Sequence, residues 1–255
     1  MILQKTIKNI NIRNEYKEFV DSFKTQLLNE FGEKIHSIYM CGSIPRGTAK
    51  PYESDADFTI LCENFLDIDR SKLNSLKEKS LEAFPLVTKI DTTVCTLDDV
   101  RNQPNEWGFW VKIICVNIYG IDFGEVIPSI VASQQFILDL NSETKHAINR
   151  VNDALTNAAD NDKKCMYIKG YSKRLIRALY SLILVDVGVW QDDIAEMMKS
   201  VITYSEINST LVEYLYECYL NSDIDVKEFK KKADEVYSYF EDCLSKMSAI
   251  NASIS

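Results

Sequence analysis

Apolar residues recur at spacings of three and four from residue 14 to residue 32, which predicts an amphipathic helix with one buried stripe. Three short runs further along the chain have the composition of β-strands, and a helical pattern separates the second run from the third. The predicted strands cover 36–41, 57–62 and 86–95, and the predicted helix covers about 70–83. This order of elements predicts a small mixed sheet covered by helices.

The second half of the chain has a different pattern and is predicted to be almost wholly helical. Residues 162–186 and 225–248 carry apolar residues at spacings of three and four, which is typical of helices packed in a bundle. A proline and several small residues near position 130 mark the change of pattern. We therefore predict an α+β protein of two domains, with residues 1–130 around the sheet and residues 131–255 as a helical bundle.

Charge and cysteine content argue against several classes of function. Lys and Arg total 29 against 38 Asp and Glu, a formal charge of −9, which argues against a protein that coats a nucleic acid polymer. The seven cysteines are widely spaced and histidine occurs twice, so neither a disulfide framework nor a Cys/His zinc site is expected. The most apolar run, 178–190, is too short for a membrane span and contains Asp186. These features predict a cytoplasmic protein with free thiols. Both a monomer and a homodimer formed through the helical half stay open.

The most informative segment reads MCGSIPRGTAKPYESDADFTIL in the printed sequence. A strand is predicted to end at Cys41, and Gly42 permits a tight turn with close approach of the backbone to a ligand. Ser43 offers a hydroxyl and an N–H group that can hold phosphate oxygens at the start of a short helix. Asp55 and Asp57 lie two residues apart at the next strand, so both point to one face. Their mutual repulsion favours a bound cation such as magnesium, although the same residues also suit an ordinary turn.

A third acidic residue, Asp91, lies in the last predicted strand. Ile90 and Val94 share one face of that strand, while Lys89 and Asp91 share the other. If this strand lies beside 57–62, the three carboxylates form a cluster that can hold two metal ions about 3.5–4 Å apart. The alternative is that Asp91 is a solvated residue on an edge strand.

The combination GSIPRG…SDAD, with an acidic residue on a later strand, resembles the nucleotidyltransferase superfamily of DNA polymerase β. It is similar to small bacterial members, namely the aminoglycoside and lincosamide nucleotidyltransferases and the minimal nucleotidyltransferases of toxin–antitoxin pairs. VNIYGIDFGEVIP, at 116–128, resembles a segment that these proteins carry after the third strand, and YIKGYSKRLIRALYSLI, at 167–183, resembles their helical domain. The resemblance implies a polymerase β-like nucleotidyltransferase domain followed by a helical bundle.

The resemblance also implies metal-dependent catalysis. Asp55, Asp57 and Asp91 would hold Mg²⁺, with two ions expected, and ATP or another NTP would be the nucleotide substrate. Asp91 would also serve as the catalytic base, for which Glu106 and Glu125 are weaker alternatives.

The implied nucleotide-binding residues are Gly42, Ser43, Arg46 and Lys173. Arg46 is either a phosphate contact or a surface charge. Lys173 belongs to a basic segment in which positions 169, 173 and 177 share one helix face. The alternative for this segment is a solvated face with no ligand.

Together these features predict an enzyme that transfers a nucleoside monophosphate, AMP foremost, from an NTP to a hydroxyl of a small molecule and releases pyrophosphate. The resemblance and the acidic charge suggest a cationic acceptor such as an aminoglycoside-type antibiotic. Two alternatives stay open: AMP transfer to a protein, as by an antitoxin, and a nucleotide-sensing or partner-binding module without turnover. Trp107, Phe109 and Trp110 either line an acceptor pocket or pack in the core.

Overall fold

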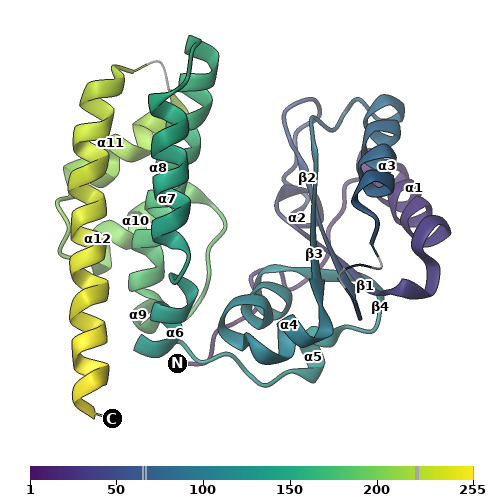
Figure 1. Ribbon diagram of the computed structural model, residues 1–255, viewed down its shortest axis with the longest axis horizontal. Helices are drawn as coiled ribbons and strands as arrows, with labels where there is room; N and C mark the ends of the chain where they lie inside the picture. Colours follow the sequence, from purple (N-terminus) through teal and green to yellow (C-terminus); the bar gives the residue numbers. More distant parts are fainter. Residues whose placement is uncertain (65, 67, 222–223, 255) are drawn as a thin grey trace. The chain divides into compact units, whose positions relative to one another are not determined.

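In the computed structural model, the chain folds into two compact units (Figure 1). One unit comprises Gln4–Ile130, and the other comprises Met1–Leu3 together with the chain from Val131 onward. The first three residues belong with the second unit because Ile2 forms a β-bridge with Val131. The structure describes residues 1–64, 66, 68–221 and 224–254.

The first unit is built on a four-stranded mixed sheet with the strand order β3-β2-β1-β4. Strands β2 and β3 run parallel, and β1 is antiparallel to both of its neighbours. The strands are β1 (Ile35–Cys41), β2 (Ala56–Cys62), β3 (Ile90–Thr96) and β4 (Val116–Gly120). The α-helices are α1 (Asn14–Phe31), α2 (Ser43–Arg46), α3 (Arg70–Ala83), α4 (Leu97–Asn102) and α5 (Phe123–Val126). A 3₁₀ turn (Gly32–Lys34) and two π-helical turns (Pro104–Gly108 and Trp110–Ile114) complete the described elements.

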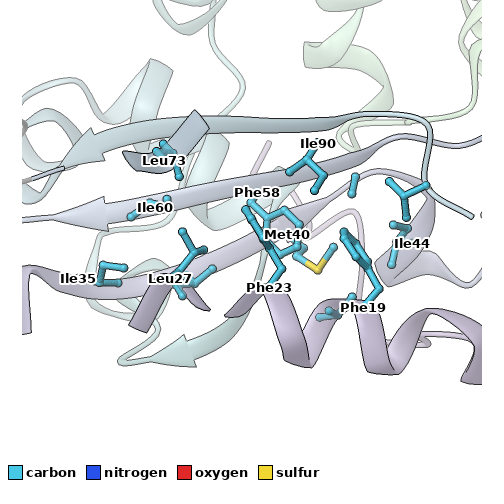
Figure 2. Packing of buried hydrophobic residues seen from close by; sticks show 14 of the residues in the cluster. Phe19, Phe23, Leu27, Ile35, Met40, Ile44, Phe58, Ile60, Leu73 and Ile90 are labelled. Carbon is cyan, nitrogen blue, oxygen red and sulfur yellow. The ribbon is translucent and has the colours of Figure 1, made fainter. Parts of the chain in front are cut away.

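Helix α1 packs its apolar stripe against one face of the sheet, and this contact forms the core of the first unit (Figure 2). Phe19 and Phe23 lie one turn apart and both contact Phe58 of β2, with ring centroids 6.1 Å and 4.8 Å from it. Successive strand residues point to opposite faces of a sheet. Because Phe58 and Ile90 point into this core, the residues that flank them, Asp57 among them, point to the other face.

The third strand is shorter than predicted, since it begins at Ile90 and not at residue 86. The segment ahead of it is hydrogen-bonded to the loop that precedes β2. The Tyr52 N–H donates to the Leu86 carbonyl at 2.8 Å, and the Thr88 N–H donates to the Ser54 carbonyl at 3.1 Å. These backbone groups are therefore used by a loop, although the residue types alone favour a strand.

The second unit is a bundle of helices in which α8 contacts α7, α10, α11 and α12 (Figure 1). An edge-on contact between Tyr171 and Phe229, with centroids 5.6 Å apart, joins α8 to α12. The helix predicted over 162–186 is interrupted at Ile183, which lies between α8 and α9. The helices are α6 (Gln134–Leu140), α7 (Thr144–Thr156), α8 (Asn161–Leu182), α9 (Leu184–Val187), α10 (Ile194–Tyr204), α11 (Ser209–Leu220) and α12 (Val226–Ile254).

The sheet with its helices, followed by a helical region, confirms the predicted fold class. Among the described residues, no helix is both long and apolar enough to cross a membrane.

Candidate active site

Three carboxylates meet at one edge of the sheet in the first unit. Ligand oxygens of Asp55, Asp57 and Asp91 all lie within 4.8 Å of one another. Asp57 and Asp91 are direct partners in the parallel register of β2 and β3, so their side chains leave the sheet on the same face. Asp55 comes immediately before β2 and is exposed, while the other two are half-buried. The structure thus brings together the acidic residues that the sequence singled out.

The turn after β1 lies directly beside this acidic cluster. The last residue of β1, Cys41, pairs with Asp57, and Gly42 follows with φ 82° and ψ −154°. A β-carbon on Gly42 would lie only 2.9 Å from the Asp57 Oδ2 atom. A glycine is therefore required both by the backbone angles and by the closeness of the carboxylate. Ser43, the next residue, begins the short helix α2.

Arg46 is bonded to the turn itself, a role that the sequence analysis did not consider. Its Nε donates to the Gly42 carbonyl oxygen at 2.9 Å, across the single turn of α2. The Thr48 N–H donates in addition to the Ser43 carbonyl at 3.0 Å. These contacts hold the backbone of the turn from the side of the helix, so that Arg46 helps to fix the conformation of Gly42.

Asp91 has a cationic neighbour on its own strand face. The Lys89 ammonium lies 2.8 Å from the Asp91 Oδ2 atom, and both side chains are substantially exposed, at 65% and 45%. An exposed pair of this kind adds little to stability, because water screens it and two long side chains must be ordered. Its main effect is to reduce the local excess of negative charge at the cluster. The sequence pattern had already placed these two residues on the same face.

Thr59 and Trp110 lie next to Asp57 on the same side of the sheet. The sequence left the role of Trp110 open and gave no signal for Thr59. Thr59 lies two residues after Asp57 on the same face, is buried, and accepts a hydrogen bond from the Trp110 Nε1 atom at 2.9 Å. Trp110 is half-buried, whereas Phe109 is buried in the core.

Burial, followed by the neighbouring Cys41 thiol, raises the pKa of the Cys115 thiol well above its usual range. All seven cysteines are free.

The donor set of the acidic cluster fits magnesium. Mg²⁺ prefers oxygen ligands from one or two carboxylates together with substrate phosphates. Three converging carboxylates without histidine or cysteine in the group supply such oxygens, and they repel one another unless a cation is bound. The cluster found among the described residues does not contain Glu106 or Glu125, the two weaker candidates for the base.

Lys173 lies in the second unit, on α8, where it lines a cavity of about 410 Å³. Arg174 and Arg177 line the same cavity, and no carboxylate is among its lining residues. Burial, and then repulsion by Arg150 and Arg177, lowers the pKa of Arg174. Lys169, predicted on the same helix face, instead places its ammonium 5.6 Å from the centre of the Tyr219 ring.

Comparison with known proteins adds independent evidence on the fold. Residues 20–99 match the family model described as a nucleotidyltransferase domain. No curated protein sequence matches the chain. The crystal structure of spectinomycin adenyltransferase AAD(9) from Enterococcus faecialis with ATP and spectinomycin is similar, with a TM-score of 0.57 and 14% identity. The likeness covers 89% of this chain and 98% of that one, and at this identity it bears on the fold alone. The first unit therefore contains a polymerase β-like nucleotidyltransferase domain, as its GS turn and acidic strand residues indicated.

Proposed function

We propose that the protein is a magnesium-dependent nucleotidyltransferase that moves a nucleoside monophosphate, AMP foremost, from an NTP to a hydroxyl of a small molecule. The observation that carries this proposal is the cluster of Asp55, Asp57 and Asp91 beside the Gly42–Ser43 turn, inside a nucleotidyltransferase domain. The reducing cytoplasm is the proposed setting, which suits seven free cysteines.

The acidic cluster and the neighbouring Gly42–Ser43 turn have separate roles in the proposed reaction. Asp55, Asp57 and Asp91 would hold two magnesium ions, which when bound neutralise phosphate charge and lower the pKa of the acceptor hydroxyl. Gly42 and Ser43 hold the β and γ phosphates through the Ser43 hydroxyl and backbone N–H groups. The acceptor oxygen bonds to the α phosphorus, the α–β phosphoanhydride bond breaks, and pyrophosphate leaves. Asp91 accepts the hydroxyl proton.

The acceptor that we propose is an aminoglycoside-type antibiotic. The similar crystal structure contains ATP and spectinomycin, which is an observation about that protein. In this chain the formal charge of −9 and the acidic cluster favour a cationic acceptor over an anionic one.

Pyrophosphate release tests the proposed function. The purified protein is incubated with Mg²⁺ and each of the four NTPs, with and without spectinomycin, other aminoglycosides and lincosamides. We expect release that requires one NTP and one acceptor, and that stops when EDTA removes the metal. Binding of an NTP without release under any acceptor would instead favour a sensor, and the absence of NTP binding would contradict the proposal outright.

Lys173 is proposed to bind the triphosphate of the same nucleotide. We expect Lys173→Met to raise the KM for the NTP about tenfold, because hydrogen bonds to charged groups contribute about 1.5–3 kcal/mol. The matched control is Lys227→Met, which removes an exposed lysine from α12 and should leave KM unchanged. Equal KM values for both variants and the wild type would remove Lys173 from the binding set.

A further inference from the structure

The turn that precedes the acidic cluster contains a backbone conformation that its residue type does not favour. Tyr52 has φ 65°, and it is the only non-glycine residue with positive φ in the described part of the chain. The Glu53 N–H donates to the Lys50 carbonyl at 3.2 Å, which closes a β-turn with Pro51 in the second position and Tyr52 in the third. Proline followed by a positive φ is the pattern of a type II turn, in which glycine is the preferred third residue.

The surrounding hydrogen bonds hold this turn firmly in place. The Lys50 N–H donates to the Ser54 Oγ at 2.9 Å, and the Ser54 N–H donates to the Lys50 carbonyl at 3.0 Å. The Tyr52 N–H is bonded to Leu86 at 2.8 Å, as described above. Yet the Tyr52 side chain is 71% exposed, so burial in the core does not explain a tyrosine at a glycine-favouring position. Residues held in such a strained conformation by their surroundings cluster at active sites and ligand-binding sites.

The position of the turn relative to the acidic cluster suggests that function. Tyr52 lies three residues before Asp55, and its turn is bonded to the segment that leads into β3. Ser43, the proposed ligand of the β and γ phosphates, follows β1 on the other side of β2. In the proposed reaction the α phosphate lies at the carboxylates, and the Tyr52 turn lies at the edge of the sheet where β2 and β3 begin, which is the edge that carries these carboxylates.

Among the described aromatic residues of this unit, Tyr52 has the most exposed side chain, whereas Trp107 and Trp110 are half-buried. Two described tyrosines of this unit are exposed, Tyr52 at 71% and Tyr119 at 39%. Tyr119 pairs with Ile38 of β1, three residues before the Cys41 end at which the acidic cluster lies. Tyr119 is therefore remote from the site along the strand, whereas Tyr52 is exposed at the sheet edge that carries the acidic cluster.

We propose that Tyr52 is a stacking platform for the base of the bound nucleotide, an inference that rests on the proposed function. An aromatic ring stacks on the flat face of any base, so this contact adds affinity without strong base selectivity. The rigid turn keeps the ring outside the protein surface and ready for the ligand, which explains why a strained tyrosine is retained where glycine would fit the backbone better.

The test compares a ligand that has a base with one that lacks it. Binding of ATP, GTP, CTP and UTP, and separately of inorganic tripolyphosphate, is measured by calorimetry with Mg²⁺ and without acceptor. Tyr52→Gly should weaken the tightest-binding NTP about tenfold or more, in the range known for base–aromatic stacking, and should leave tripolyphosphate affinity unchanged. Tyr52→Phe should retain NTP affinity, and the control Tyr119→Ala should bind both ligands like the wild type.

Thermal unfolding separates a ligand contact from a structural role. Because glycine relieves the positive φ, the melting temperature of Tyr52→Gly should equal or exceed that of the wild type. A stable variant with weaker NTP binding supports the stacking contact. Unchanged NTP binding, or an equal loss for NTP and tripolyphosphate, overturns it while leaving the proposed function intact. A wild-type protein that binds neither ligand overturns both.

Discussion

Asp57→Asn is expected to lower the rate of nucleotidyl transfer by about a thousandfold or more while leaving the fold intact. Asp57 is the central member of the cluster, paired with Asp91 across the parallel strands and adjacent to Gly42. Stabilisation of transition-state charge by a bound metal is worth several kcal/mol, and each 1.36 kcal/mol corresponds to about a tenfold rate change. The amide keeps the shape of the side chain but removes the charge that binds the cation. Initial rates of pyrophosphate release at saturating Mg²⁺ measure the loss.

Thermal unfolding provides the second measurement on the same variant. In EDTA, Asp57→Asn should melt at the same temperature as the wild type or higher, since one of three repelling charges is gone. Added Mg²⁺ should stabilise the wild type and not the variant, because a ligand stabilises only a state that binds it. Asp98→Asn, which alters an exposed carboxylate paired with Arg101, is the matched control. Retention of more than about a tenth of the wild-type rate would exclude Asp57 as an essential metal ligand.

Gly42→Ala is expected to lower both stability and the rate of nucleotidyl transfer through a single added methyl group. The backbone angles at Gly42, φ 82° and ψ −154°, belong to a region that only glycine adopts readily, and a β-carbon there would lie 2.9 Å from the Asp57 Oδ2 atom. The strain should cost about 1–3 kcal/mol of the free energy of unfolding. In addition, the carboxylate must shift to relieve the contact, and we expect the transfer rate to fall at least about a hundredfold, since small misplacements in an active site cost this much.

Gly32→Ala separates these two effects. Gly32 also has a positive φ, 53°, but a β-carbon there would have nothing within 4 Å. Both variants should lose stability in urea unfolding, whereas only Gly42→Ala should lose activity and the stabilisation by Mg²⁺. Similar rates for the two variants, assayed well below their melting temperatures, would show that strain alone limits the activity and that the contact with Asp57 does not matter.

Much of the fold could be predicted because its signals are local. The stripe of α1 alternates by three and four, and Phe19 and Phe23 indeed face the sheet. The alternation in β3 placed Ile90 in the core. The start of this strand was predicted too early, because the backbone groups of Leu86 and Thr88 are used by a loop far away in the sequence. Residue type favours a strand, but it carries no information about such a distant partner.

The geometry of the site was predictable only where it depends on local sequence, namely on the alternation of side chains along a strand. The parity of Asp55 and Asp57 is a local property, but the neighbourhood of Asp91 depends on the parallel pairing of β2 with β3. The bond from Arg46 to Gly42 and the bond from Trp110 to Thr59 also arise from the folded chain. Polar side chains such as these fit several environments equally well, so composition and spacing alone left both of their roles open.

The first three residues belong to the same unit as the chain from Val131 onward. Ile2 pairs with Val131, and the Ala132 N–H donates to the Met1 carbonyl at 2.8 Å, so the start of the chain belongs to the helical unit. Topologically, the nucleotidyltransferase unit is an insertion within the other unit and is tethered to it at both of its ends. During synthesis, Met1–Leu3 can pair with Val131 and Ala132 only after about 130 further residues have been made. The inserted unit can already be folded by then. Substitutions in Met1–Leu3 would therefore disturb the helical unit first, even though the residues that follow them belong to the nucleotidyltransferase unit.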